Sequence, residues 1–217
     1  QVNAFEFFCN NALSRVVGAH QYQRPFDTES PFYALVELEN TEIETETVFE
    51  VYSKCVDEKL ITDGVISQSI DQARALWRLR EDISETLWHF QPYKNDISVR
   101  ISKMADFLND VSQLIQKNYP DFEIIWYGHI GDGNIHLNIL KPKNLSTLQF
   151  KSFCDGVSMS LGELISKYEG SISAEHGVGL LKKESLRFSR SEDEINLMKS
   201  IKKIFDPNAI LNPGKLI

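Results

Sequence analysis

The segment 126–138 constrains the fold more than any other part of the chain, because it has the pattern of a tight β-hairpin. Asp132-Gly133 is a dipeptide typical of two-residue hairpin turns, and strand-forming residues lie on both sides of it. A hairpin makes its two strands antiparallel neighbours, which excludes an all-parallel sheet. We therefore predict an α+β fold with ferredoxin-like units, in which helices cover mainly one face of a mixed or antiparallel sheet.

The spacing of apolar residues predicts the order of the other elements. Helices are expected at residues 4–17, 45–60, 69–87, 102–118 and 146–168, with a last helix after Ser191; strands are expected at residues 32–39, 64–67, 95–101 and 171–174, with two more across 122–140. Ser69 with Gln72, and Ser191 with Glu194, have the capping-box spacing that begins a helix. No repeat or linker indicates a domain boundary.

Composition argues against several classes of protein. The chain has 217 residues, of which 42% are hydrophobic, enough for one domain or a closely packed pair of subdomains. A net charge of -8 argues against a nucleic-acid partner, and no apolar run of about 18 residues indicates a membrane span. The three cysteines form no C-x-x-C pair, which favours a reducing, cytoplasmic setting over a disulfide framework or a cysteine zinc site.

The predicted hairpin also pairs two histidines. With Asp132-Gly133 as the turn, His129 falls opposite His136, and Asn138 lies on the same face. Side chains directly opposite one another are roughly 5 Å apart, so two imidazole nitrogens can converge on one divalent ion. A single histidine is more often a hydrogen-bonded core residue, but two that face each other beside a glycine-rich turn favour a ligand pair.

A second unusual segment, residues 170–179, supplies a candidate third ligand. Two histidines and one carboxylate leave coordination positions open for water or substrate, as in a catalytic ion site. We assign Glu175 to the metal, with zinc as first choice and manganese or iron(II) after it. Its neighbour His176 points to the opposite side if the backbone is extended, and is then free to act as a base. Taken alone, the segment is equally well explained as a solvated turn.

Three motifs resemble a known family: YGHIGDGNIHLN at 127–138, SAEHGVG at 173–179 and FDPNAILNPGK at 205–215. In this order they are similar to the C-terminal domain of the FAD-linked oxidases, which include D-lactate, glycolate and D-2-hydroxyglutarate dehydrogenases. Residues 76–84 and 93–99 look most like the D-2-hydroxyglutarate branch. The likeness covers nearly the whole chain, so residues 1–217 would be that substrate- and metal-binding domain.

The resemblance implies roles for individual residues. His129, His136 and Glu175 would hold the metal, His176 would be the catalytic base, Arg80, Ser84, Lys94 and Asn138 would bind substrate carboxylates, and Asn212 would lie near the flavin. Independently, Arg80 and Ser84 are four residues apart and would share one helix face. Arg80 offers a planar fork for a carboxylate and Lys94 a point charge, although either residue alone is more often a surface charge.

The implied reaction is oxidation of a small anionic D-2-hydroxy acid, 2-hydroxyglutarate being favoured, to the 2-oxo acid. FAD would be bound mainly by a flavin domain preceding Gln1, because the chain has no Gly-x-Gly-x-x-Gly or Walker loop. The fragment alone is then expected to be inactive. Alternatives are a D-lactate or glycolate dehydrogenase fragment, a non-catalytic metal or small-acid-binding module, and a metal-assisted hydrolase or lyase. The electron acceptor and the oligomeric state, a homodimer included, are left open.

Overall fold

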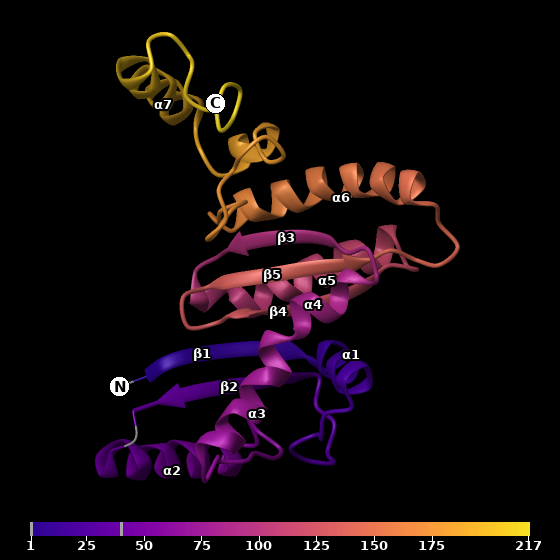
Figure 1. Ribbon diagram of the computed structural model, residues 1–217, viewed down its shortest axis with the longest axis vertical. Helices are drawn as coiled ribbons and strands as arrows, with labels where there is room; N and C mark the ends of the chain where they lie inside the picture. Colours follow the sequence, from indigo (N-terminus) through magenta and orange to yellow (C-terminus); the bar gives the residue numbers. More distant parts are fainter. Residues whose placement is uncertain (1, 40) are drawn as a thin grey trace. The chain divides into compact units, whose positions relative to one another are not determined.

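The computed structural model describes residues 2–39 and 41–217, which form two compact units. The first unit comprises the chain as far as Pro92 together with Ile125–Gly131. The second comprises Tyr93–Ile124 and Asp132–Ile217. Figure 1 shows the elements of each unit in sequence colours. Every strand pairing described below is antiparallel, so the predicted α+β class is confirmed.

The first unit is built around its N-terminal strand. Its elements are β1 (Val2–Cys9), α1 (Asn10–His20), β2 (Phe32–Leu38), α2 (Glu42–Asp57), α3 (Ile70–Glu81), α4 (Ile83–Trp88) and most of β4 (Glu123–His129). β1 pairs with β2 on one side and with β4 on the other, so Phe7 lies opposite both Ala34 and Gly128. Helix α1 packs on α3 and α4, and the core contains Leu13, Ile83 and other fully buried side chains.

The helix predicted at residues 4–17 is wrong in its first half, where the chain forms β1. The last four residues of this strand, from Glu6 to Cys9, are all buried. A strand that is covered on both faces shows no alternation of apolar and polar residues, so its pattern is easily taken for that of a buried helix. The helical spacing is correct only from α1 onward.

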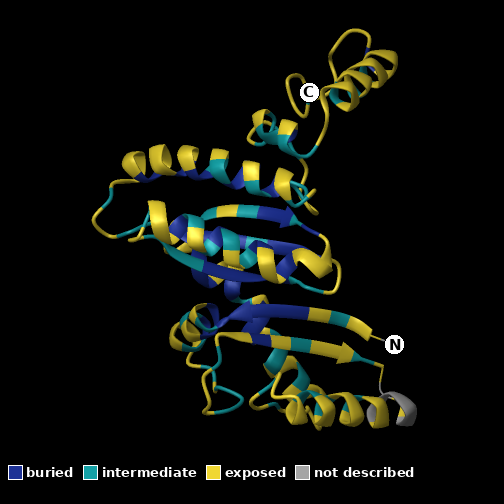
Figure 2. Ribbon diagram, turned by 180° about the vertical axis from the view of Figure 1, so that it is seen from behind, coloured by how far each residue is buried: buried dark blue, intermediate teal, exposed yellow. Residues whose placement is uncertain are grey.

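The second unit contains β3 (Tyr93–Ser98), the 3-10 helix η1 (Ile101–Lys103), α5 (Met104–Asn118), β5 (Asn134–Leu140), α6 (Thr147–Lys167), the 3-10 helix η2 (Glu184–Phe188) and α7 (Glu192–Phe205). β3 pairs with β5, and α5 packs on α6. Figure 2 shows the buried residues of α6 along one side of that helix and the exposed residues along the other. Phe107, Ile135 and Leu137 are fully buried in the core of this unit.

Three other predicted elements differ from the structure. The helix expected at 69–87 is divided at Asp82 into α3 and α4, residues 64–67 form no strand, and the strand expected at 171–174 is reduced to one bridge between Ser98 and Ser171. Both predicted caps begin helices, but at the first the Gln72 side chain accepts from the amide of Gln68 rather than that of Ser69. None of the described helices is long and apolar enough to span a membrane.

We predict that Gly133→Ala destabilises the second unit. Gly133 has φ +83, and a Cβ on it would lie 2.2 Å from the carbonyl oxygen of Val99. The left-handed conformation alone costs about 1–2 kcal/mol for a residue with a Cβ, and the clash adds to that cost. Gly179→Ala is the matched control, because Gly179 has φ +56 but nothing within 4 Å of its Cβ.

Urea unfolding of the two variants measures the difference. A loss of stability in Gly133→Ala no greater than that in Gly179→Ala would contradict the close approach at the hairpin turn.

Candidate metal and substrate site

Strands β3 and β5 place four polar side chains on one face of their ladder. In the antiparallel register Lys94 lies opposite Asn138, and Asp96 lies opposite His136. Directly opposed residues share a face, and residues two apart along a strand also share it. The alternate residues of β5, which include Ile135 and others of the core, face the other way. The polar residues predicted at 94, 136 and 138 therefore lie together.

Two of these four side chains, Asp96 and Asn138, are buried, whereas His136 is half-buried and Lys94 is exposed. Asp96 is 3% exposed and Asn138 is 1% exposed. The Asn138 side-chain oxygen has no hydrogen-bond partner among the described residues. A buried acceptor without a partner is costly, so this oxygen is available to a ligand.

The loop that carries Glu175 and His176 is bound to the same face through Asp96. Oδ2 of Asp96 accepts hydrogen bonds from the backbone amides of Ala174, Glu175 and His176 at 3.0, 3.1 and 2.9 Å. Three consecutive amides that converge on one anionic oxygen form an anion-binding turn. The loop therefore curves around Asp96 instead of continuing as a strand.

This curvature changes the expected directions of two adjacent side chains. We predicted from an extended backbone that Glu175 and His176 point to opposite sides. In the loop, Oε1 of Glu175 lies 3.6 Å from Nε2 of His136 and 3.6 Å from Nε2 of His176. The two imidazole rings are stacked at 6.3 Å, and the His176 side chain is 67% exposed. One carboxylate thus lies near two imidazoles.

Lys182 holds the other side of this loop. Its Nζ donates hydrogen bonds to the carbonyl oxygens of Ile172 at 2.9 Å and Asp96 at 3.3 Å, and to Oγ of Ser173 at 3.3 Å. Burial lowers the pKa of Lys182, and the negative charge of Asp96 opposes that shift. Lys182 belongs to none of the motifs identified in the sequence, so its role was not predicted.

In the first unit, the predicted metal ligand His129 is bound to a buried acid. Glu6 lies opposite His129 in the β1–β4 register, and Oε1 of Glu6 is 2.7 Å from Nδ1 of His129. A carboxylate at one ring nitrogen fixes the tautomer of the imidazole and leaves the other nitrogen for a metal, which is the usual arrangement around metal-bound histidine.

Glu6 also binds the predicted substrate residue Arg80. The guanidinium lies 2.8 Å from Oε2 of Glu6 and 4.8 Å above the ring of Tyr127. Arg80 is 7% exposed, and its Nε has no hydrogen-bond partner among the described residues. Arg80 is therefore a buried cation rather than a surface charge, with one donor left unused.

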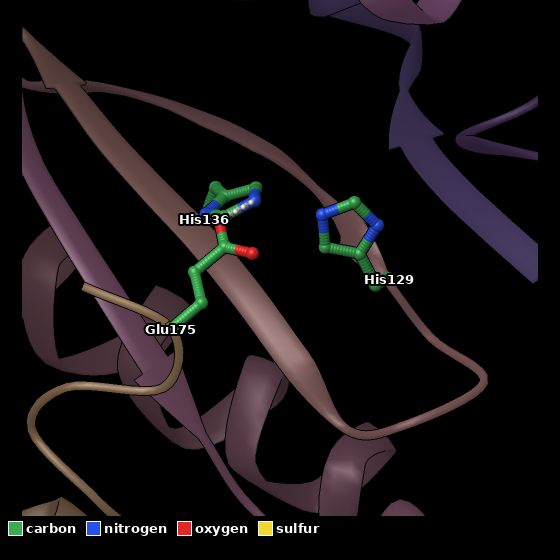
Figure 3. A group of neighbouring side chains, drawn as sticks. All are labelled: His129, His136 and Glu175. Carbon is green, nitrogen blue, oxygen red and sulfur yellow. Dashed lines mark ion pairs between the residues drawn. The ribbon is translucent and has the colours of Figure 1, made fainter.

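The three predicted metal ligands form a cluster of donor atoms. One atom from each of His129, His136 and Glu175 lies within 4.8 Å of the others, and Figure 3 shows the three side chains. The turn predicted at Asp132-Gly133 occurs, but it is longer than two residues, because β4 ends at His129 and β5 begins at Asn134.

The remaining predicted site residues are more dispersed. Ser84 lies in α4, beyond the break that separates it from Arg80 in α3, so the two residues do not share one unbroken helix. Asn212 is exposed in the C-terminal tail with φ 46, and its side-chain oxygen accepts a hydrogen bond from Lys215 at 3.5 Å.

Comparison with known proteins gives consistent matches along the whole chain. The family described as FAD linked oxidases, C-terminal domain, matches residues 1–216. The chain is 50% identical to a D-2-hydroxyglutarate dehydrogenase of Stutzerimonas stutzeri over 99% of its own length and 47% of the relative's.

Two further relatives have similar coverage. A D-2-hydroxyglutarate dehydrogenase of Xanthomonas citri pv. viticola is 47% identical over 100% of this chain and 46% of its own length. A putative mitochondrial D-lactate dehydrogenase of Schizosaccharomyces pombe is 36% identical over 100% of this chain and 42% of its own length. The chain thus spans about half the length of the curated relatives that it matches. Because one of these relatives is named as mitochondrial, the cytoplasmic setting of this protein stays a prediction.

We predict that Glu6→Gln lowers the free energy of unfolding by about 3–5 kcal/mol, because it leaves the Arg80 charge buried without its counterion. Combining it with Arg80→Met removes that charge, so the double variant should be more stable than Glu6→Gln alone. Chemical denaturation of the three proteins measures this coupling.

The control is Glu169→Gln, which breaks an ion pair with Arg100 whose two side chains are 70% and 69% exposed. It should cost less than about 1 kcal/mol. If Glu6→Gln were as mild as this control, the Glu6–Arg80 pair would contribute no more than a surface pair.

Proposed function

The chain belongs to the FAD linked oxidases, C-terminal domain family, and from that premise we propose that it is the substrate- and metal-binding half of a flavin-dependent D-2-hydroxyacid dehydrogenase. The names of the relatives that are 50% and 47% identical favour D-2-hydroxyglutarate as substrate. D-lactate is the second candidate, because of the name of the relative that is 36% identical.

The observation that carries the proposal is the cluster of His129, His136 and Glu175, whose donor atoms lie within 4.8 Å of one another. Two imidazole nitrogens and one carboxylate form a donor set that suits zinc or a similar divalent ion and leaves positions for substrate. Each histidine also has a buried acid near Nδ1: Glu6 at 2.7 Å from His129, and Asp96 at 3.7 Å from His136. These carboxylates would orient the rings toward an ion.

We propose that each unit contributes residues that bind the substrate. Lys94 and Asn138 lie on the same ladder face as His136, and the unpaired side-chain oxygen of Asn138 could accept a bond from a substrate hydroxyl. In the first unit, the unused Nε of Arg80 could donate to a substrate carboxylate while the other end of the guanidinium remains with Glu6.

His176 is the candidate base for the hydroxyl proton. It is exposed, and its ring is flanked by Glu175 and Asp96, each with an oxygen 3.6 Å from a ring nitrogen. These acids flank the ring that would take up the proton and would hold its orientation. A bound divalent ion would stabilise negative charge on the substrate oxygen and so reduce the basicity that His176 needs.

The sequence has no Gly-x-Gly-x-x-Gly loop, and Asn212, the residue that the family resemblance assigns to the flavin, lies exposed in the tail. FAD would accept the electrons of the oxidation. We propose that it is bound mainly by a separate domain of the full-length protein, which corresponds to the part of the relatives that this chain does not match.

The metal assignment is tested by elemental mass spectrometry of the purified chain. We expect about one zinc or manganese ion per chain, and we expect a His129→Ala, His136→Ala variant to lose it. The matched control removes two other histidines, His20 and His89, which lie outside the donor cluster. It should keep the ion. Retention of metal by the first variant would overturn the assignment.

The substrate assignment is tested by steady-state kinetics of the full-length protein that carries this chain. We expect a higher kcat/KM with D-2-hydroxyglutarate than with D-lactate or glycolate. Lys94→Ala should lower kcat/KM by about 10- to 100-fold, the cost of one hydrogen bond to a charged group. Lys151→Ala, at an exposed position of α6, should leave it unchanged. A preference for D-lactate would favour the second candidate.

A further inference from the structure

Asp96 is neither a metal ligand nor a substrate-binding residue in the assignments above, where it only flanks the rings of His136 and His176, yet it also binds the backbone of the loop that carries Glu175. We propose that Asp96 is a positioning residue, which sets the backbone of residues 174–176 and thereby aims Glu175 and His176 at the site. The inference rests on the proposed function, because it concerns the same metal ligand and the same base.

The first argument is the number of donors at one oxygen. Oδ2 of Asp96 accepts three consecutive amides, those of Ala174, Glu175 and His176. Three donors occupy the lone pairs of that oxygen, so it has no capacity left to coordinate an ion. Asp96 therefore acts through the loop rather than as a fourth ligand through this atom.

The second argument is the position of Asp96 on the ladder. Asp96 is directly opposite His136, and its Oδ1 lies 3.7 Å from Nδ1 of that ring. One carboxylate thus contacts His136 through one oxygen and the backbone of Glu175 through the other. Because Asp96 contacts both residues, it keeps Oε1 of Glu175 at 3.6 Å from Nε2 of His136.

The third argument is that Lys182 fixes Asp96 and the loop together. Its ammonium group bonds the backbone oxygen of Asp96, the carbonyl of Ile172 and the hydroxyl of Ser173. The Ser173 hydroxyl in turn donates to the carbonyl oxygen of His176. Both ends of the short loop are held, and the buried negative charge has a cation nearby.

Position and charge can be separated at this residue. Asp96→Asn keeps an acceptor oxygen at the same distance from the backbone, so it can still bind the three amides without the charge. Asp96→Glu keeps the charge but moves the carboxylate outward by one methylene group. A positioning role therefore predicts that the Glu variant is more damaged than the Asn variant, whereas a purely electrostatic role predicts the reverse.

The experiment uses the full-length protein that carries this chain, with Asp96→Ala, Asp96→Glu and Asp96→Asn. Hydrogen exchange of the amides of residues 174–176 is compared with that of the α5 amides, and kcat, KM and metal content are measured with D-2-hydroxyglutarate as substrate. Asp96→Ala and Asp96→Glu should speed exchange in the loop alone and lower kcat by about 10- to 100-fold, the range for residues that orient metal ligands. Asp96→Asn should lower kcat by less than about 10-fold.

The matched control is Asp110→Asn, which removes a carboxylate that binds Lys167 and Tyr168 elsewhere in the second unit. It should leave loop exchange and kcat unchanged. A Glu variant with wild-type kcat and loop exchange would overturn the proposal, as would an Ala variant with a loosened loop but unchanged kcat.

If the proposed function is wrong, the results differ from those expected if only the role of Asp96 is wrong. The wild-type protein would then hold no metal and oxidise none of the 2-hydroxy acids, while loop exchange would still report on Asp96. In that case, faster exchange at residues 174–176 in the Ala and Glu variants would support the fastening of the loop, and unchanged exchange would overturn it. If Asp96→Ala fails to fold, the comparison of the Glu and Asn variants decides.

Discussion

The arrangement of the site in the second unit depends on one buried carboxylate. Asp96 lies on β3, opposite a histidine of β5, and three amides of a distant loop converge on its Oδ2. Without that acceptor, the loop amides would need other partners, because buried amides are rarely left unpaired. The interaction thus joins residues that are about eighty positions apart in the sequence.

The negative charges of the two buried acids, Glu6 and Asp96, are compensated in different ways. Glu6 lies between an imidazole and a guanidinium, so its charge is balanced by a cation in direct contact. For Asp96, three backbone amides bind Oδ2, and the Lys182 ammonium binds the backbone carbonyl oxygen of the same residue. In a chain with a net charge of -8, two basic groups, Arg80 and Lys182, are thus held beside buried acids.

The sequence was sufficient for the features that local chemistry determines. Capping serines, the turn after His129 and the common face of His136 and Asn138 follow from residue types at fixed spacing, whereas the role of His129, His136 and Glu175 as metal ligands stays a prediction. Burial on both faces concealed β1, and residue spacing alone could not predict that the loop at residues 174–176 curves around a side chain of another strand. Sequence analysis missed Glu6 and Asp96 because each acid acquires its role from partners that are far away in the sequence. For Asp96 there was one local signal: it is two residues from Lys94 in a predicted strand, so both side chains lie on the same face.

The β3–β5 register has a consequence for folding. A slip of one residue in a strand reverses which face every side chain points to. A slip of β5 would put His136 and Asn138 among the aliphatic core and expose Ile135, Leu137 and Ile139, all of which are fully buried. The polar residues that make the site therefore penalise the wrong strand alignment strongly, so the same residues that serve chemistry also help the chain to choose its native pairing.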